Sequence, residues 1–394
     1  MQKSFKVEIK PTAAQLVLLK KHAGVARFVY NWGLKQKEER GITMAAPLSK
    51  LLNSKKKVEF PWMYEVSAHT IQLALRNLEH AFKLYWNDIE KPKEQRQFEH
   101  PVFKKKNGSD HFSLVYGPGR KAFGSKITST TIHLPRIGVV KLKRHNFLPI
   151  CIYNSVISVS RHADRWFVSV WKEVELPKTE TTDGVIGIDL GIKILAQLST
   201  GEQFQSPKRT KQRTNRLKRL QRKLSRQKKG SNKRNKTKNR VAKEHYRIAC
   251  QRKDALHKLT SYLTKTKSER TLVIEDLNVS DMLNHKAVYE VGFYEFRRQL
   301  EYKCKWYGKK LVIADRFFPS SKRCSSCGLK NQDLTLKDRS WTCSCGAVHD
   351  RDLNAALNLQ QYPWFEGNWR ESAKARLTRP DVGVLIDAGN ATVA

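Results

Sequence analysis

Four cysteines lie close together late in the sequence, and their spacing is typical of a metal site. Cys324 and Cys327 form a C-x-x-C pair and Cys343 and Cys345 form a C-x-C pair, with a glycine after each pair and 15 residues between the pairs. A C-x-x-C turn places two thiolates on one side of a tight turn, and a second pair completes the tetrahedral set that Zn²⁺ prefers. The pattern therefore predicts one structural Zn²⁺ that holds together a segment with almost no core of its own. The alternative is four unrelated cysteines, and the short C-x-C pair departs from the common spacing.

Three acidic residues end or begin elements that the sequence predicts to be buried. Asp189 follows V-I-G-I, Glu275 follows L-V-I, and Asp352 stands before L-N-A-A at the start of a predicted helix. A lone carboxylate is costly to bury unless it is paired or binds a metal. Three converging carboxylates would repel one another unless divalent cations neutralise them, and Mg²⁺ prefers such oxygen ligands. Two Mg²⁺ ions about 4 Å apart can activate a water and stabilise the leaving 3′ oxygen of a phosphodiester.

Each carboxylate also has another interpretation. Asp189 could cap a turn, and a G-I-D-L-G strand also opens sugar-kinase and chaperone ATPases, although we find no adenosine-binding segment to support an ATPase. Asp276 competes with Glu275 and could cap the turn that follows. Asp350 competes with Asp352, and either could be the N-cap of the next helix.

The composition points to a polyanionic partner. The chain has 394 residues, enough for two or three domains, and 76 Lys and Arg against 36 Asp and Glu, a formal net charge of +40. No stretch approaches 18 consecutive apolar residues and no apolar run follows the N-terminal charges, so we expect neither a membrane span nor a secretory signal. The clustered cysteines favour a reducing compartment. We expect the scattered Cys151, Cys250 and Cys304 to be buried small hydrophobic residues.

The densest basic segment is residues 208–240, with 17 Lys or Arg and no Asp or Glu. Leucines at helical spacing within it predict a pair of long helices with a loop near Gly230–Ser231. The absence of balancing acidic residues favours phosphate binding over a solvated helix pair that binds nothing. The candidate phosphate contacts are Lys208, Arg209, Lys211, Arg216, Arg219, Arg222 and Lys223.

Two further pairs of polar residues are candidate nucleic-acid contacts. Gln72 and Arg76 lie on the polar side of a predicted helix over 67–86, where they could contact duplex DNA or simply face solvent. Lys322 and Arg323 stand beside the first cysteine pair and could hold the strand to be cut, or serve the structure alone.

Hydrophobic periodicity predicts two larger folding units. A period of two predicts strands of a small β-barrel, with a helical unit at about 10–90 inserted after the N-terminal strand. Those strands cover 5–9, 127–134, 139–142, 156–160 and 166–174. Short buried strands that alternate with helices then predict an α/β domain. Those strands cover 185–190, 194–198, 272–274 and 311–313, and a last helix covers 353–361.

Several blocks of sequence resemble the TnpB family of transposon-encoded, RNA-guided DNA endonucleases, which are compact relatives of type V CRISPR effectors. The blocks run in order through nearly the whole chain, as far as residue 358. They are H-T-I-Q-L-A-L-R-N-L-E-H-A-F at 69–82, G-I-D-L-G-I-K at 187–193, V-I-E-D-L at 273–277, S-S-K-R-C-S-S-C-G at 320–328 and H-D-R-D-L-N-A-A-L-N at 349–358.

The resemblance implies a RuvC nuclease domain with a ribonuclease-H-like fold. Its catalytic motifs match Asp189, Glu275 and Asp352, and Asp352 is preferred to Asp350 because the family motif uses the acidic residue directly before x-N-A-A. These residues would bind two catalytic Mg²⁺ ions, and one site would cut both DNA strands because no second nuclease motif is present.

The resemblance also implies a domain order. A wedge domain of β-barrel type contains a helical recognition domain, and a zinc-binding, target-nucleic-acid module of zinc-ribbon type interrupts the nuclease domain. The expected bounds are 1–10 and 108–178 for the wedge, 11–107 for recognition, 179–318 and 347–362 for the nuclease, 319–346 for the zinc module and 363–394 for a tail.

The implied partners are a guide RNA from the right end of the transposon, called ωRNA or reRNA, and double-stranded target DNA with a short flanking motif. Pairing with the guide would read most of the target sequence. We expect a monomeric protein in a cytoplasmic, prokaryotic ribonucleoprotein that joins the nucleoid when it binds DNA. The alternatives are a transposase that acts on its own element and a non-catalytic RNA-binding or regulatory protein.

Overall fold

The computed structural model describes residues 2–106, 110–116, 127–149, 155–176, 180–192, 194–206, 208–277, 292–335 and 338–365. The chain divides into two compact units, which we call the first and the second unit. The first comprises Met1–Glu175 and Leu220–Tyr246, and the second comprises Leu176–Arg219 and Arg247–Ala394. In the described part of the chain, none of the helices is long and apolar enough to span a membrane.

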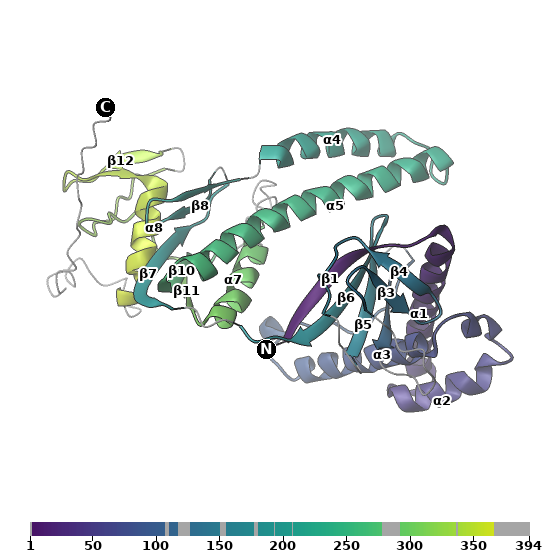
Figure 1. Ribbon diagram of the computed structural model, residues 1–394. Coiled ribbons are helices and arrows are strands. Elements are labelled where there is room, and N and C mark those ends of the chain that lie inside the picture. The colour runs from purple at the N-terminus through teal and green to yellow at the C-terminus, as the bar shows by residue number, and fades with distance from the viewer. Residues whose placement is uncertain are drawn as a thin grey trace. The chain divides into compact units, whose positions relative to one another are not determined.

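A six-stranded antiparallel sheet forms the centre of the first unit (Figure 1). The order is β2-β5-β6-β1-β4-β3, so the N-terminal strand pairs on both sides with strands that come much later in the sequence. The strands are β1 (Gln2–Lys10), β2 (His111–Tyr116), β3 (Thr131–Leu134), β4 (Gly138–Leu142), β5 (Ser155–His162) and β6 (Arg165–Glu173). Strands β2 and β3 stand at the two ends of this order, and each pairs with one other strand, β2 with β5 and β3 with β4. An isolated bridge also joins Ile132 of β3 to Ile127. Among the described strands, β2 and β3 do not pair with each other, so the closed barrel stays a prediction.

Three helices lie between β1 and β2 in the chain and cover this sheet with a shared core. They are α1 (Ala13–Arg40), α2 (Ala45–Lys56) and α3 (Ala68–Ile89). A short 3₁₀ turn at Pro61–Glu65 separates α2 from α3, and another at Lys93–Gln95 follows α3. Thr12 and Gln15 form a capping box at the start of α1, with the Gln15 backbone N–H donating to Thr12 Oγ1 at 3.3 Å. The sequence analysis did not predict α2, whose only buried residues are Leu48 and Leu52.

The basic segment forms the predicted helix pair. Helix α4 spans Lys208–Ser225 and helix α5 spans Asn232–Ser261, and the two run along each other in Figure 1. Gly230 lies in the connection with a positive φ of 84°, which favours glycine. Arg234 donates from Nη1 to the backbone oxygen of Gln227 at 2.8 Å, so one residue of the basic run stabilises the turn itself.

The second unit contains a five-stranded mixed sheet in the order β11-β10-β7-β8-β9. Strand β10 runs parallel to β7 and β11, whereas β8 pairs antiparallel with β7 and with β9. The strands are β7 (Thr182–Asp189), β8 (Ile194–Leu198), β9 (Gln203–Gln205), β10 (Glu269–Glu275) and β11 (Lys310–Ala314). A π-helical turn (Tyr262–Thr266) ends α5, α7 spans Phe293–Tyr307, and α8 spans Arg351–Gln361 before a last 3₁₀ turn at Tyr362–Phe365.

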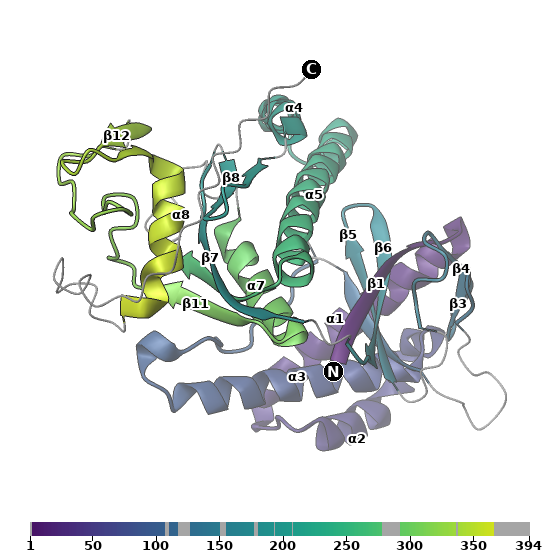
Figure 2. The ribbon, with the colours of Figure 1, turned by 60° about the vertical axis from the view of Figure 1, so that its left-hand side comes forward.

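Alternating residues of β7 and β10 face two different helical layers. Ile186, Ile188 and their neighbours on β10 share a core with leucines of α5 and aromatic residues of α7. The other face meets α8, which lies against β7 in both views (Figures 1 and 2). Gly187 makes this close approach possible, because a Cβ atom there would lie 1.9 Å from the backbone oxygen of Ala356. The first glycine of G-I-D-L-G therefore has a packing role.

The cysteine-rich segment forms a small module with its own core. A hairpin of β12 (Ser340–Thr342) and β13 (Val348–Asp350) packs Trp341 and Leu334 against Cys324 and Cys343. Of the scattered cysteines, Cys304 is buried as predicted, and its pKa is raised to about 11 by burial.

The prediction for the other two scattered cysteines has a different outcome. The interpretation of Cys250 as buried is wrong, because it lies on the exposed side of α5. Cys151 lies outside the described residues. The predicted tail is described only as far as residue 365.

Candidate active site and metal centre

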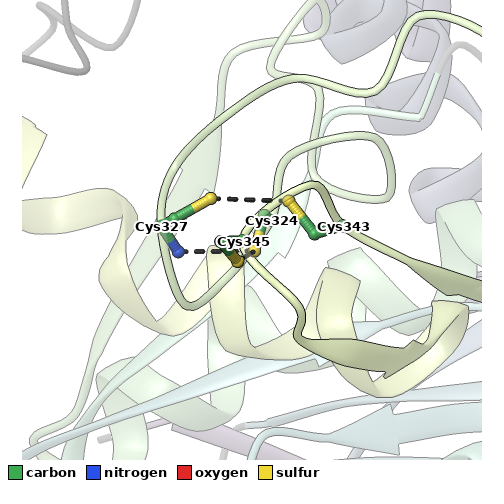
Figure 3. A group of neighbouring side chains, drawn as sticks. All are labelled: Cys324, Cys327, Cys343 and Cys345. Carbon is green, nitrogen blue, oxygen red and sulfur yellow. Dashed lines mark hydrogen bonds between the residues drawn. The ribbon is translucent and has the colours of Figure 1, made fainter.

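The four cysteines of the paired motifs converge on one point, as Figure 3 shows. Their sulfur atoms all lie within 4.8 Å of one another, with Cys327 Sγ 3.5 Å from Cys343 Sγ and Cys324 Sγ 3.8 Å from Cys345 Sγ. The four residues whose spacing predicted a shared site are therefore close together in the structure. Four sulfur donors at this spacing suit a tetrahedral ion that binds thiolates, and Zn²⁺ is the ordinary choice.

The protonation of these thiols is set by their local surroundings. The backbone amide of Cys345 lowers the pKa of Cys343 to about 6, whereas burial raises the pKa of Cys327 to about 12. A divalent cation among the sulfurs would stabilise all four thiolates, which is the donor set that a closed structural site requires.

His349 is a neighbour of the cluster that the sequence analysis did not single out. Its Nε2 lies 3.0 Å from Cys324 Sγ, and its buried ring packs against Trp341 with 4.8 Å between centroids. Burial lowers the pKa of His349, so a neutral ring can donate its N–H to the sulfur. The only signal in the sequence was its place in the H-D-R-D motif.

Helix α8 holds the first cysteine turn through two buried asparagines. Asn354 donates from Nδ2 to the backbone oxygen of Arg323 at 2.8 Å, and its Oδ1 accepts from the Ser325 backbone N–H at 2.9 Å. Asn358 donates from Nδ2 to the backbone oxygen of Ser320 at 2.8 Å. The cysteine module is therefore fastened to the helix that also carries Asp352.

The three candidate carboxylates come together at one edge of the mixed sheet. Asp189 is the last residue of β7 and Glu275 the last of β10, and the pairing of Ile188 with Ile274 places these two ends side by side. Because alternate residues of a strand share a face, both carboxylates lie on the side that meets α8. Asp352 is in the first turn of α8.

The electrostatics of this cluster reflect the shortage of positive charge. Burial, and then the neighbouring Glu275 and Asp352 carboxylates, raise the pKa of Asp189 well above its usual range. Burial also raises the pKa of Glu275, against the opposing effects of a hydrogen bond from Ser320 and the charge of Arg351. Within the described residues, the four cysteines form the one group of three or more potential metal ligands whose donor atoms all lie within 4.8 Å of one another. The donor atoms of the three carboxylates are therefore more widely spaced than those of the cysteines.

The structure separates Asp352 from its competitor Asp350. Asp350 is the N-cap of α8, and its Oδ1 accepts from the Leu353 backbone N–H at 2.9 Å. Asp352 instead contributes to the charge around Asp189 and lies 3.5 Å from Arg339 Nη1. The competitor of Glu275 is also occupied, because Asp276 forms ion pairs with Arg297 at 2.8 Å and Arg316 at 3.1 Å.

Matches to known proteins agree with the motifs that surround this site. A family model described as "Probable transposase" matches residues 167–286, and a model of the Cas12f1-like TNB domain matches residues 293–359. A relative from Streptomyces pristinaespiralis, which carries the name of an RNA-guided DNA endonuclease, is 36% identical over 370 residues. The match covers 91% of this chain and 89% of the relative.

The chain belongs to the TnpB family.

Another relative of this TnpB-family chain also matches over most of its length. InsQ of Escherichia coli (strain K12), also named as an RNA-guided DNA endonuclease, is 28% identical over 383 residues, which cover 90% of this chain and 91% of InsQ. The structure of a Cas12f1–sgRNA–target DNA complex matches with a TM-score of 0.46 and 11% identity, over 91% of this chain and 98% of that one. A helix-turn-helix model matches residues 1–40, but these residues form strand β1 and the single unbroken helix α1.

Two residues beside the carboxylates escaped the sequence analysis, although they lie within TnpB-like motifs. The Ser320 hydroxyl, in S-S-K-R-C, donates to Glu275 Oε1, and the Ser320 residue is buried. Arg351, in H-D-R-D, lies close enough to lower the pKa of both Asp189 and Glu275, and its Nη1 donates to the Thr335 backbone oxygen at 2.9 Å. Both link the cysteine module to the carboxylates.

The candidate nucleic-acid contacts occupy varied positions. Gln72 and Arg76 are exposed on the side of α3 opposite its buried face, as predicted for that helix. Lys322 Nζ donates to the Gln332 backbone oxygen at 3.2 Å. Arg323 is buried, with its guanidinium 4.8 Å from the Phe365 ring centre, which favours the structural interpretation for this residue.

The predicted contacts of the basic segment all lie on helix α4. Arg216, Arg219, Arg222 and Lys223 are exposed there. The side chains of Lys208, Arg209 and Lys211 lie outside the described residues.

Proposed function

We propose that this protein is an RNA-guided DNA endonuclease that cuts both DNA strands at the cluster of Asp189, Glu275 and Asp352. The observation that carries the proposal is the arrival of these three carboxylates, from distant parts of the chain, at one edge of the mixed sheet. In sheets with parallel strands, ligands bind at the carboxyl ends of those strands. The family membership and the names of the relatives support the same activity.

The donor set fits divalent metal. Asp189 and Glu275 are held partly buried near one another although their charges repel, and a cation would remove that cost. We infer that the three carboxylates would hold two Mg²⁺ ions. When bound, such ions supply Lewis-acid stabilisation of the phosphodiester and a more acidic water.

The neighbouring side chains of the protein orient these ligands. Ser320 fixes one oxygen of Glu275 by donating its hydroxyl proton, which leaves the other oxygen available. Arg339 and Arg351 supply positive charge near Asp352 and Asp189, where the phosphate of a strand would otherwise meet only carboxylates. We assign these three residues to positioning and charge balance, and hydrolysis to the three carboxylates.

The other parts of the chain fit the binding of two nucleic acids. We infer that the mixed sheet is the ribonuclease-H-like core of a RuvC domain. The six-stranded sheet of the first unit would belong to a wedge domain, and helices α1 to α3 would form the recognition domain. The cysteine module would hold one Zn²⁺ and contact the target. The exposed cations of α4 would hold the nucleic-acid backbone, while base pairing with a transposon-derived guide RNA selects the sequence.

A second candidate is a transposase that acts on its own element without a guide. The description of the matching family model favours it, and clusters of carboxylates also serve DNA strand transfer. The two candidates differ in their need for RNA.

The deciding experiment uses the full chain as a monomeric ribonucleoprotein isolated from prokaryotic cells that carry its locus. The RNA that copurifies is sequenced, and cleavage of a matching DNA duplex is measured with and without that RNA. We expect double-strand cuts that require the RNA, Mg²⁺ and a matching target. Cleavage or strand transfer that proceeds equally well after the RNA is removed would favour the transposase.

The Asp189→Ala variant assigns the chemistry to the site. We expect cleavage to fall below detection, a loss of more than about 100-fold. Mutating a residue that only orients a metal ligand costs about 10–100-fold in activity, and loss of the ligand itself should cost more. RNA and DNA binding should remain near the wild-type value. Loss of RNA binding in this variant would count against a purely catalytic role.

A further inference from the structure

A pocket of about 340 Å³ in the first unit is separate from the carboxylate and cysteine sites. It lies between α1, α3, the start of β2 and the segment that precedes β2. Its size is at the lower end of the range of roughly 300–1,000 Å³ for sites that bind small molecules. It therefore has room for a single small group and is too small for a duplex.

The floor of the pocket is made of small and aromatic residues. Ala23 and Ala26 of α1, Ala74 of α3 and Phe112 of β2 line it, and all four are buried. Three alanines on two facing helices leave the space that larger side chains would fill. A flat apolar face, such as that of a sugar or a base, fits this floor.

One polar group of the floor lacks a partner. The Thr70 side chain lines the pocket and is 1% exposed, and its hydroxyl makes no hydrogen bond within the described part of the protein. A buried polar group without a partner destabilises the fold, so this hydroxyl would gain from a ligand that can donate or accept a hydrogen bond.

The rim of the pocket is cationic. Arg27, Lys104 and Lys105 line it together with one carboxylate, Asp110. Asp110 is already engaged, with Arg27 Nη1 at 3.4 Å and Arg161 Nε at 3.1 Å. The remaining charge favours an anionic ligand.

Lys104 is held in place by the protein. Its backbone N–H donates to Asn31 Oδ1 at 2.8 Å, and Asn31 Nδ2 donates to its backbone oxygen at 3.0 Å. Its ammonium group lies 3.6 Å from the centre of the Tyr30 ring. Burial lowers the pKa of Lys104, and a bound anion would offset that effect.

We propose that this pocket binds one nucleotide of a nucleic-acid strand, with its phosphate beside Arg27, Lys104 and Lys105 and its sugar or base on the alanine floor against Thr70. The combination of a cationic rim, an apolar floor and the unpaired Thr70 hydroxyl matches the phosphate, the ring and the polar groups of a nucleotide. The proposal rests on the proposed function and deepens it, because it places a specific nucleotide contact in the first unit. Either the guide RNA or the target DNA could supply the nucleotide.

The test compares two fluorescein-labelled oligonucleotides of equal length, oligo-uridine and oligo-deoxythymidine, by fluorescence anisotropy with the full chain. The Ala74→Leu variant fills the pocket. We expect it to weaken binding of one of the two about tenfold, within the range for losing one stacked base. The oligonucleotide that is affected identifies RNA or DNA as the source.

Two adjacent lysines provide a matched charge control. Lys105 lines the pocket and Lys106 does not, and both are exposed. We expect Lys105→Gln to reduce the slope of log affinity against log salt by about 1, as for the loss of one phosphate contact. Lys106→Gln should change the slope less.

The Thr70→Val variant removes the hydroxyl with little change in shape and guards against a folding failure of Ala74→Leu. We expect it to weaken the same oligonucleotide severalfold at an unchanged salt slope. The proposal is wrong if Ala74→Leu and Thr70→Val melt like the wild type and bind both oligonucleotides with wild-type affinity. If the wild-type chain binds neither oligonucleotide nor its own RNA, it is the proposed function that fails.

Discussion

The cysteine cluster and the carboxylate cluster are two candidate metal sites that the chain assembles in different ways. The four sulfurs lie within 4.8 Å of one another, and the residues that carry them come from one short segment, 324–345. The three carboxylates come from β7, β10 and α8, and they raise rather than lower the pKa of Asp189. A cluster of thiols can gather as neutral groups, whereas ionised carboxylates resist gathering until a cation arrives.

The comparison extends to what holds each site. The cysteine turns are held locally, by the hairpin of β12 and β13 and a small core around Trp341. The carboxylates depend on the parallel register of two strands and on the close packing of α8 against Gly187. Damage to the fold of the second unit should therefore disperse the carboxylates before the cysteines.

The strongest test of the carboxylate cluster replaces, one at a time, the two neighbouring acidic residues at the end of β10. We expect Glu275→Gln to reduce cleavage more than about 100-fold, because it removes a metal ligand. Asp276→Asn removes the surface ion pairs with Arg297 and Arg316, which contribute about 0–1 kcal/mol to stability. This variant should therefore cleave DNA at a near-normal rate. The measurement is single-turnover cleavage in saturating Mg²⁺. Equal losses in the two variants would contradict the assignment of Glu275.

The cysteine cluster is tested by Cys324→Ser, with Cys250→Ser as a control on an exposed cysteine outside the cluster. We expect Cys324→Ser to lose bound zinc and to melt at a lower temperature, because a thiolate of the site is removed. Cleavage should fall roughly 10–100-fold, because the segment that leads into the first cysteine turn carries Ser320, which holds Glu275. Elemental analysis measures the zinc and differential scanning fluorimetry the melting. Retention of one zinc per chain in the variant would remove Cys324 from the ligand set.

The link between the two sites is tested by Ser320→Ala, with Ser321→Ala beside it as the matched control. Loss of the hydroxyl that holds Glu275 should reduce cleavage about 10-fold and raise the Mg²⁺ concentration needed for half-maximal rate. A role that is merely structural would lower the melting temperature without changing the Mg²⁺ dependence. Calorimetric titration of Mn²⁺ without nucleic acid checks the metal affinity independently of cleavage.

The smallest expected effect concerns stability without Mg²⁺. The pKa of Asp189 is raised in the folded chain, so the ionised carboxylate destabilises the fold at any pH above that raised value. Asp189→Asn should therefore raise the melting temperature by roughly 2–4 °C at pH 8. The gain should fade as the pH falls through the raised pKa, where wild-type Asp189 also becomes neutral. A gain that is constant with pH would point to packing instead of charge.

The sequence predicted the elements of both sites better than their surroundings. The cysteine set was predictable because spacing alone places the four residues together, and the ends of β7 and β10 were predictable from apolar runs that stop at an acidic residue. The choice between Asp350 and Asp352 rested on a family resemblance, and the N-cap bond of Asp350 gives its physical reason. No periodicity predicted Ser320 beside Glu275, because that contact depends on how a loop folds back over the strand ends.

Some of the misses have equally specific causes. Cys250 was expected to be buried, but it belongs to a helix whose buried stripe is narrow and whose other sides are polar. Helix α2 carries Pro47 near its start and only two buried leucines, too few to set a period. The closure of the first sheet into a barrel stays a prediction, because alternation shows which face is buried and not which edges pair.

The asparagine contacts of α8 have a consequence for the variability of the cysteine turn. Asn354 and Asn358 bond to backbone atoms of residues 320–325, not to their side chains. Apart from Ser320, the buried Arg323 and the cysteines, the turn can therefore change its side chains without losing its attachment. A library that randomises Lys322 and Ser326 while keeping both asparagines is a practical place to select variants with altered target preference.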